Sequence, residues 1–113
     1  MRQPVPTIAV LATLGLAGAA SYAQGSAQIG SPRAGRAFAL ETCTPCHVVS
    51  PSQKAPPRFA VAPSFQSIAD LPSTTALSLQ TFLVTPHPTM PNLVLSADEV
   101  GNVVAYILSL KKQ

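Results

Sequence analysis

The segment Cys43-Thr44-Pro45-Cys46-His47 restricts what this chain can fold into more than any other part of its sequence. Its two thiols are the only cysteines in the chain, and a histidine directly follows the second of them. The spacing places both sulfur atoms on neighbouring corners of one short turn and leaves the imidazole ring little freedom. The remaining residues must therefore fold around whatever these three side chains hold.

The order C-x-x-C-H is the pattern of covalent haem attachment. In this interpretation the thiols of Cys43 and Cys46 add to the haem vinyl groups as thioethers, and His47 becomes the proximal iron ligand. A C-x-x-C pair also occurs in thioredoxin-like redox proteins, short disulfides and zinc sites. For zinc, only His87 and four acidic residues remain as further ligands, and no βαβ pattern of the thioredoxin kind is visible. We therefore expect one covalently bound haem c.

The start of the chain has the composition of a secretory signal peptide. Arg2 precedes an apolar run from Ile8 to Ala20, and cleavage fits best after Ala23. The run is shorter than the roughly 20 apolar residues that span a bilayer. An uncleaved membrane anchor stays open as an alternative, because the uncharged stretch continues to Pro32. The predicted organisation is a signal peptide at 1–23, a flexible lead at 24–30 and one domain at 31–113.

Composition argues against a nucleic-acid-binding function. The formal net charge is only +3, and the sequence has no basic stripe with interleaved aromatic residues. Charged residues make up 10% of the chain and apolar residues 47%. A domain this small buries a limited fraction of its surface. A large planar cofactor in the core would supply much of the missing apolar burial.

The first helix is predicted from its N-terminal residues. Ser31 as N-cap and Pro32 at the first helical position predict a helix through Glu41, which delivers Cys43 at its end. Gly35 lowers the stability of this helix by about 1 kcal/mol relative to alanine. Its presence indicates that another backbone approaches the helix closely.

The segment between residues 48 and 63 contains several prolines, which exclude a long helix or a central strand. We expect an ordered loop along one haem edge. A metal-bound histidine usually donates its second ring N–H to an acceptor, and a carbonyl near Pro56-Pro57 is the predicted partner of His47. Arg58 or Lys54 could pair with a haem propionate. An ordinary solvated charge is the alternative for both, and we prefer it for Lys54.

Two shorter helices are predicted next. Residues 64–70 fit a helix that Leu71-Pro72 ends, and Ser73 is the predicted N-cap of another helix reaching about Val84. Both carry apolar residues at helical spacing. These residues are Phe65, Ile68 and Ala69 in the first helix and Leu79, Phe82 and Leu83 in the second.

Thr85–Leu95 contains three prolines, which keep its backbone extended and stiff. Met90 lies in this loop and not on an apolar helical face, where a methionine usually fills the core. We therefore predict that the Met90 thioether is the distal axial ligand. His87 is the rival and would make a bis-histidine iron. A surface histidine between two prolines is the interpretation that we prefer for it.

A capping box of Ser96 and Glu99 predicts the start of the last helix. Lys111 and Lys112 are predicted to close this helix at the negative end of its dipole. Tyr106 is expected to pack against the first helix. The apolar stripe of the last helix consists of Val100, Val103, Val104, Ile107 and Leu108.

Together these features resemble the small monohaem c-type cytochromes of bacteria and mitochondria. The resemblance rests on Gly35 and Phe38 in the first helix, on the Cys43–His47 motif, on Met90-Pro91 and on Tyr106. It implies an all-α, cytochrome c-like domain of three to four short helices, with the N- and C-terminal helices crossing around one haem. It also implies axial ligation by the histidine and the methionine, and haem attachment after export to the periplasm. The chain departs from the family in its short, proline-rich segment between these ligands and in its few lysines.

The expected function is electron transfer and not catalysis. An iron with six ligands has no open site for a substrate and can cycle between Fe(III) and Fe(II) with little ligand movement. The expected partners are redox proteins, either a periplasmic dehydrogenase or a terminal oxidase or reductase, and membrane contact is expected only if the signal segment is uncleaved. If Met90 does not bind, the open distal site would suit a peroxidase-like enzyme or a gas sensor. A secreted redox protein without haem is the third alternative.

Overall fold

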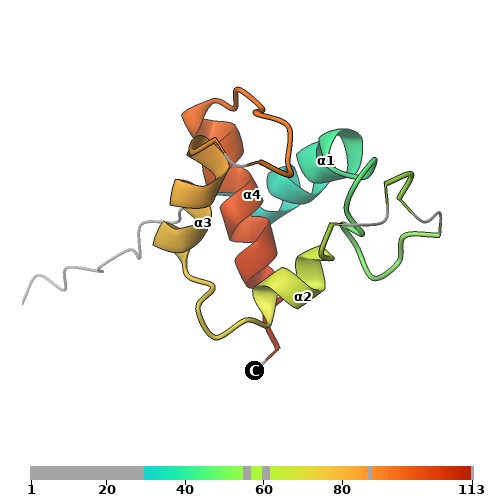
Figure 1. The fold of residues 1–113 in the computed structure, drawn as a ribbon. Helices are drawn as coiled ribbons and strands as arrows, with labels where there is room; N and C mark the ends of the chain where they lie inside the picture. Colours follow the sequence, from blue (N-terminus) through green and yellow to red (C-terminus); the bar gives the residue numbers. More distant parts are fainter. Residues whose placement is uncertain (1–29, 55–56, 60–61, 87, 113) are drawn as a thin grey trace, which may run out of the picture.

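The computed structural model describes residues 30–54, 57–59, 62–86 and 88–112. This part of the chain forms four helices and no strand, which confirms the predicted all-α fold (Figure 1). None of its helices is long and apolar enough to cross a membrane. The predicted signal peptide and flexible lead lie outside the described residues. The helices are α1 (Pro32–Thr42), α2 (Phe65–Ala69), α3 (Ala76–Val84) and α4 (Ala97–Ser109).

Helix α1 begins as predicted and ends one residue later than predicted. The Ser31 side chain accepts a hydrogen bond from the backbone N–H of Ala34, and Pro32 occupies the first helical position. Cys43 is the C-cap, and its backbone N–H donates to the carbonyl of Ala39 at 2.8 Å. The helix thus leads directly into the turn that carries the two thiols.

Helices α1 and α4 lie against each other across the centre of the molecule (Figure 1). A Cβ atom added at Gly35 would lie only 1.8 Å from the Asn102 carbonyl oxygen and 2.9 Å from Cβ of Tyr106. The predicted close approach of another backbone at Gly35 is therefore confirmed, and so is the packing of Tyr106 against α1. Gly30 meets Gly101 in the same way, with 2.4 Å between its added Cβ and the Gly101 carbonyl carbon.

Most of the buried apolar side chains come from α4 and the residues that face it. Of the predicted stripe, Leu108 is only partly buried, whereas the other four positions are buried. Four apolar positions that repeat at i, i+3, i+4 and i+7 cover one face of a helix, and this face forms the core. The core consists of Ala39, Val49, Phe65, Ala69, Leu79, Val100, Val103, Val104, Tyr106 and Ile107.

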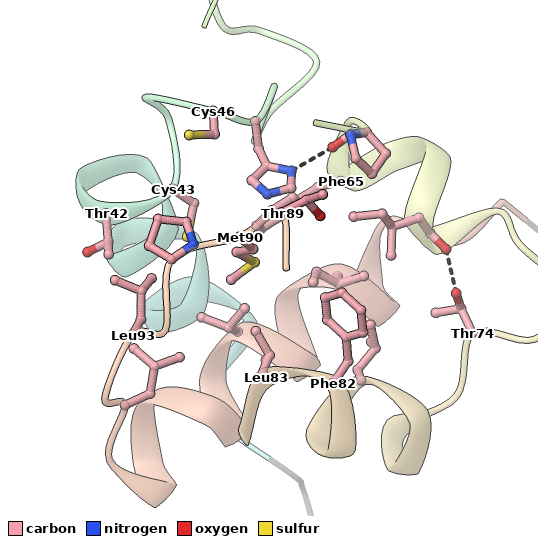
Figure 2. Close-up of a pocket in the computed structure, with 18 of the residues that line it drawn as sticks. Thr42, Cys43, Cys46, Phe65, Thr74, Phe82, Leu83, Thr89, Met90 and Leu93 are labelled. Carbon is pink, nitrogen blue, oxygen red and sulfur yellow. Dashed lines mark hydrogen bonds between the residues drawn. The ribbon is translucent and has the colours of Figure 1, made fainter. Parts of the chain in front are cut away.

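The predicted start of α3 at Ser73 is wrong. The N-cap is Thr75, which forms a capping box with Ser78. The Thr74 hydroxyl instead donates to the carbonyl of Ile68 at 2.5 Å (Figure 2). This bond draws Thr74 inward and keeps the residues before Thr75 in a turn, so the helix cannot begin earlier.

The predicted role of the two C-terminal lysines is also wrong. The capping box of Ser96 and Glu99 starts α4 as predicted, but the helix ends at Ser109, before either lysine. The Lys111 ammonium donates to the carbonyl of Thr74 at 3.2 Å. The Lys112 ammonium instead pairs with Asp70. The lysine side chains therefore bind other segments of the chain, and only the backbone N–H of Lys111 bonds to the last turn of α4, at the Leu108 carbonyl.

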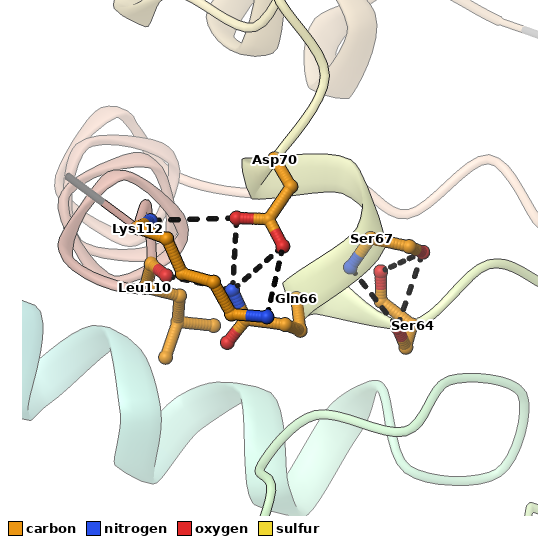
Figure 3. A network of polar contacts seen from close by, with 6 residues as sticks. All are labelled: Ser64, Gln66, Ser67, Asp70, Leu110 and Lys112. Atoms are coloured by element: carbon orange, nitrogen blue, oxygen red, sulfur yellow. Dashed lines mark hydrogen bonds and ion pairs between the residues drawn. The ribbon is translucent and has the colours of Figure 1, made fainter.

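A polar network joins the end of α4 to α2 (Figure 3). The Gln66 side-chain amide donates to the Leu110 carbonyl at 2.8 Å and to both Asp70 carboxylate oxygens. The Lys112 ammonium lies 3.7 Å from Asp70 Oδ2. The hydrogen bond from Gln66, followed by contacts with Lys112, lowers the pKa of the Asp70 carboxyl below its usual value. The network fixes α2 against the C-terminal end of α4.

Candidate functional site

A cavity of about 640 Å³ opens between the four helices, within the range of roughly 300–1,000 Å³ that small-molecule and cofactor sites occupy. All four predicted site residues line it, namely Cys43, Cys46, His47 and Met90. Figure 2 shows the cavity with Cys43 and Cys46 on one side and Phe82 and Leu83 of α3 on the other. The fold thus brings together side chains from segments that lie far apart in the sequence.

The two thiols belong to a hydrogen-bonded turn that continues from α1. The backbone N–H groups of Cys46 and His47 both donate to the Cys43 carbonyl, at 3.2 and 2.9 Å. Both cysteines are free in the structure. Burial, and to a lesser extent the neighbouring Cys46, raises the pKa of the Cys43 thiol to about 11. This thiol is therefore protonated at neutral pH, which limits its reactivity toward oxidants.

The His47 ring is oriented by a hydrogen bond to the backbone. Its Nδ1 lies 2.6 Å from the Pro63 carbonyl oxygen. Because a carbonyl can only accept, Nδ1 is the donor in this bond, and Nε2 is the ring nitrogen that the bond leaves free. The predicted partner near Pro56-Pro57 is therefore wrong, because the acceptor is the Pro63 carbonyl. The loop returns toward the histidine at this residue, just before α2. There the backbone N–H of Phe65 donates to the Val48 carbonyl. The kind of acceptor was predicted, whereas its position depended on the path of the loop.

Two aromatic rings, Phe65 and then Tyr106, follow one another on one side of the histidine ring. The Phe65 and His47 rings meet in a T-shaped arrangement, with 5.4 Å between centroids and 63° between planes. Tyr106 lies 6.2 Å beyond Phe65, and its hydroxyl donates to the Val49 carbonyl at 2.9 Å. The sequence analysis missed Phe65 and this hydroxyl bond as features of the site. The signal for Phe65 was its place on an apolar helical face only two residues after a loop proline.

Met90 lines the same cavity as the thiol-bearing turn. Its side chain points into the cavity in Figure 2. The backbone after it turns back, since the N–H of Leu93 donates to the Pro91 carbonyl at 2.9 Å. The rival distal ligand, His87, lies outside the described residues. The structure therefore places the predicted methionine at the cavity and does not bear on the rival histidine.

The cavity walls are mostly apolar, with a few Ser and Thr side chains, and no Asp, Glu, Lys or Arg of the described residues lines them. Phe59, Leu71 and Phe82 line it although they are 62%, 52% and 53% exposed, so they form its rim. Lys54 and Arg58 are exposed and do not line it. A large, flat, apolar group with few polar atoms matches such walls.

The donor set of the cavity fits haem c. Two thiols, an imidazole and a thioether are the side chains that attach a haem and ligate its iron. Within the part of the chain that the structure describes, no three His, Cys, Asp or Glu side chains are placed to hold a metal ion. The zinc alternative thus has no support among these residues.

Comparison with known proteins identifies the family. No family model matches the chain, and no solved structure matches it. The chain is similar to cytochrome c-552 of Bradyrhizobium diazoefficiens, with 42% identity over 77 residues that cover 68% of this chain and 72% of the relative. The described part of the chain is all-helical, and the chain is 42% identical to a cytochrome c. The chain therefore belongs to the c-type cytochromes.

Proposed function

We propose that this protein is an electron carrier that holds one haem c and is not an enzyme. The observation that carries the proposal is the convergence of Cys43, Cys46, His47 and Met90 on one uncharged cavity. The likeness to a relative named as a cytochrome c supports the same function. When bound, haem supplies one-electron chemistry between Fe(III) and Fe(II).

The proximal side chains hold and orient the group. Cys43 and Cys46 would attach it through thioethers, and the short turn between them limits where it can lie. The Pro63 carbonyl fixes His47 with its proton on Nδ1, so that Nε2 is the nitrogen available to iron. A hydrogen bond of this kind also makes the imidazole a more basic ligand.

The distal side and the walls determine the reactivity. Met90 would supply a thioether as the second axial ligand, which raises the potential relative to a second imidazole. The apolar walls exclude water, which disfavours the more highly charged oxidised centre and acts in the same direction. With His47 and Met90 both as ligands, the iron would have no position left for a substrate.

We further propose that the carrier works in the periplasm and exchanges electrons with protein partners. The apolar segment from Ile8 to Ala20 and the requirement for haem attachment after export support this location. A periplasmic dehydrogenase as donor or a terminal oxidase or reductase as acceptor fits a carrier of this kind.

Expression with haem-maturation machinery tests the proposal. The intact mass should exceed that of the polypeptide by one haem, and the ferric spectrum should show the weak far-red band of methionine–iron coordination. Met90→Ala should abolish this band and lower the midpoint potential, whereas Thr89→Ala, which changes a neighbouring cavity residue without a sulfur atom, should preserve both. High-spin ferric features in the unmodified protein would instead support the open-site alternatives, an enzyme or a gas sensor.

A further inference from the structure

The two edges of a haem make different demands on the cavity. The vinyl groups, which the thiols attach, lie on one edge of the porphyrin, and the two propionate carboxylates lie on the opposite edge. Attachment at Cys43 and Cys46 would therefore direct the propionates to the end of the cavity away from these cysteines, which we call the far end. Figure 2 shows the two cysteines on one side of the cavity and Thr74 on the other.

A carboxylate at the far end needs hydrogen-bond donors and a positive charge. An ionised group that is buried without either is strongly disfavoured. The chain contains no Asp, Glu, Lys or Arg between Leu71 and Ala97, a stretch that comprises α3 and the segment leading past Met90 to α4. The donors must therefore be neutral groups of the wall, and the positive charge must come from another part of the chain.

Hydroxyl side chains are grouped where the far end meets the start of α3. Ser73, Thr74 and Ser78 all line the cavity. A hydroxyl has one proton to donate, and two of these hydroxyls already use theirs. The Thr74 hydroxyl donates to the Ile68 carbonyl, and the Ser78 hydroxyl donates to the Ser73 carbonyl at 3.1 Å.

Ser73 differs from these two residues, because its donors are not used by the protein. Among the described residues, no group accepts a hydrogen bond from its hydroxyl or from its backbone N–H. The residue lies in the turn before α3 and is exposed on one side while it lines the cavity on the other. Ser73 can therefore offer two donors to a carboxylate at the far end.

Lys111 brings a positive charge to the same end. Its ammonium donates to the Thr74 backbone carbonyl at 3.2 Å, which holds the charge beside a residue of the cavity wall. This bond uses one of the three protons of the ammonium. The neighbouring charges, Lys112 and Asp70, lie 3.7 Å apart and largely offset each other (Figure 3). No acidic side chain of the described residues pairs with Lys111.

We propose that Ser73 and Lys111 position a haem propionate at the start of α3. This inference rests on the proposed haem-binding function and names the residues that receive the charged edge of the group. Ser73 donates from its hydroxyl and backbone N–H, and Lys111 balances the negative charge. The pair takes the place of Arg58 and Lys54 as propionate partners, since both of those side chains are exposed and neither lines the cavity.

Resonance Raman spectroscopy of the haem-bearing protein tests the contact itself. The bending mode of a propionate shifts when its hydrogen bonds change, so Ser73→Ala and Lys111→Gln should each shift this mode. Ser73→Thr keeps a hydroxyl and should retain the mode of the unmodified protein. As the matched control, Thr81→Ala removes an exposed hydroxyl of α3 that does not line the cavity, and it should leave the mode unchanged.

Redox titration as a function of pH gives a second readout. Because the oxidised iron carries one more positive charge, Lys111→Gln should lower the ratio of reduced to oxidised protein at a fixed potential by about threefold. Loss of a nearby cation also raises a carboxyl pKa, so the pH at which the potential falls with propionate ionisation should rise by about 0.5–1 unit. Lys54→Gln removes the same charge from the loop before α2 and should change neither value.

The remaining outcomes separate this inference from the proposed function. A shifted mode in Arg58→Gln or Lys54→Gln, with none in Ser73→Ala and Lys111→Gln, would assign the propionate to the loop and overturn the proposal. A mode that no variant shifts would assign both propionates to solvent, with the same consequence. In these two cases an unchanged far-red band would leave the electron carrier intact. An intact mass without haem would overturn the proposed function as well.

Discussion

The α1–α4 pair and the uncharged stretch from Leu71 to Ala97 use apolar residues in opposite ways. In the pair, apolar and glycine residues lie inside an interface so close that a Cβ at Gly35 would lie 1.8 Å from a carbonyl oxygen. In the uncharged stretch, Leu77 and Val84 face solvent, and Val94 is 97% exposed. The difference indicates that close polypeptide contacts fix the first region, whereas apolar side chains of the second remain exposed to solvent.

The largest effect is expected at the closest contact of the helix pair. Gly35→Ala should destabilise the fold by roughly 3–5 kcal/mol, because the new methyl group forces α1 and α4 apart. Chemical denaturation of the haem-bearing protein measures the change, with Ala37→Ser at an exposed α1 position as the matched control. A loss below about 1 kcal/mol for Gly35→Ala would show that α1 and α4 can move apart at little cost, and it would contradict the view that close contacts fix this pair.

Truncation of one side chain in each region sharpens the contrast. Val104 is fully buried and does not line the cavity, so Val104→Ala should cost roughly 2 kcal/mol through lost burial and a new void. Leu77→Ala removes more atoms but should change the free energy of unfolding by less than about 0.5 kcal/mol. Denaturation curves for the two variants compare these values directly. Similar losses would mean that the exposed side of α3 that carries Leu77 also contributes to the stabilising core.

A smaller effect is expected where α4 meets the loop behind the histidine. Tyr106→Phe deletes the hydroxyl that donates to the buried Val49 carbonyl at 2.9 Å. The loss should be roughly 1–2 kcal/mol, because the carbonyl is left without this donor. Thermal unfolding checks the value. Since the Phe65 ring lies between Tyr106 and His47, the visible spectrum of the variant should stay unchanged, and loss of the far-red band would indicate a wider role for the tyrosine.

The smallest effect concerns the pH dependence at the two ends of α4. Hydrogen bonds from Ser96, the backbone N–H first, lower the pKa of Glu99, and the bond from Gln66 lowers that of Asp70. Both carboxylates therefore favour the folded state above the ordinary carboxyl pKa of about 4, and this contribution is lost as the pH falls through their lower folded values. Glu99→Gln and Asp70→Asn should each flatten the fall of the denaturation midpoint below about pH 5. A slope identical to that of the unmodified protein would contradict these pKa shifts.

Local signals predicted the helix pair better than the cavity wall. Ser31, Pro32 and the Ser96–Glu99 capping box act within a few residues, and they located both helix starts. The N-cap of α3 was misplaced because several hydroxyl side chains follow one another before this helix, and each of them could cap it. Tertiary contacts decide among them, here the bond from Thr74 to the Ile68 carbonyl.

Long-range contacts were the other part that the sequence could not specify. The Pro63 carbonyl, the Lys111 bond to Thr74 and the Lys112 contact with Asp70 all join segments whose meeting depends on the path of intervening loops. The members of the site were predictable, because the motif residues and Met90 carry distinctive chemistry. Their supporting partners were not, because a backbone carbonyl has no sequence signature.

The contact between α1 and α4 has a consequence for the newly made chain. The backbone N–H of Ser31 donates to Asn102 Oδ1 at 2.8 Å, and Gly30 and Gly35 rest on the same turn of α4. During synthesis, α1 emerges from the ribosome long before the surface onto which it docks exists. Until the residues of α4 have been added, Cys43 and Cys46 therefore remain on a polypeptide that has not yet closed around the cavity.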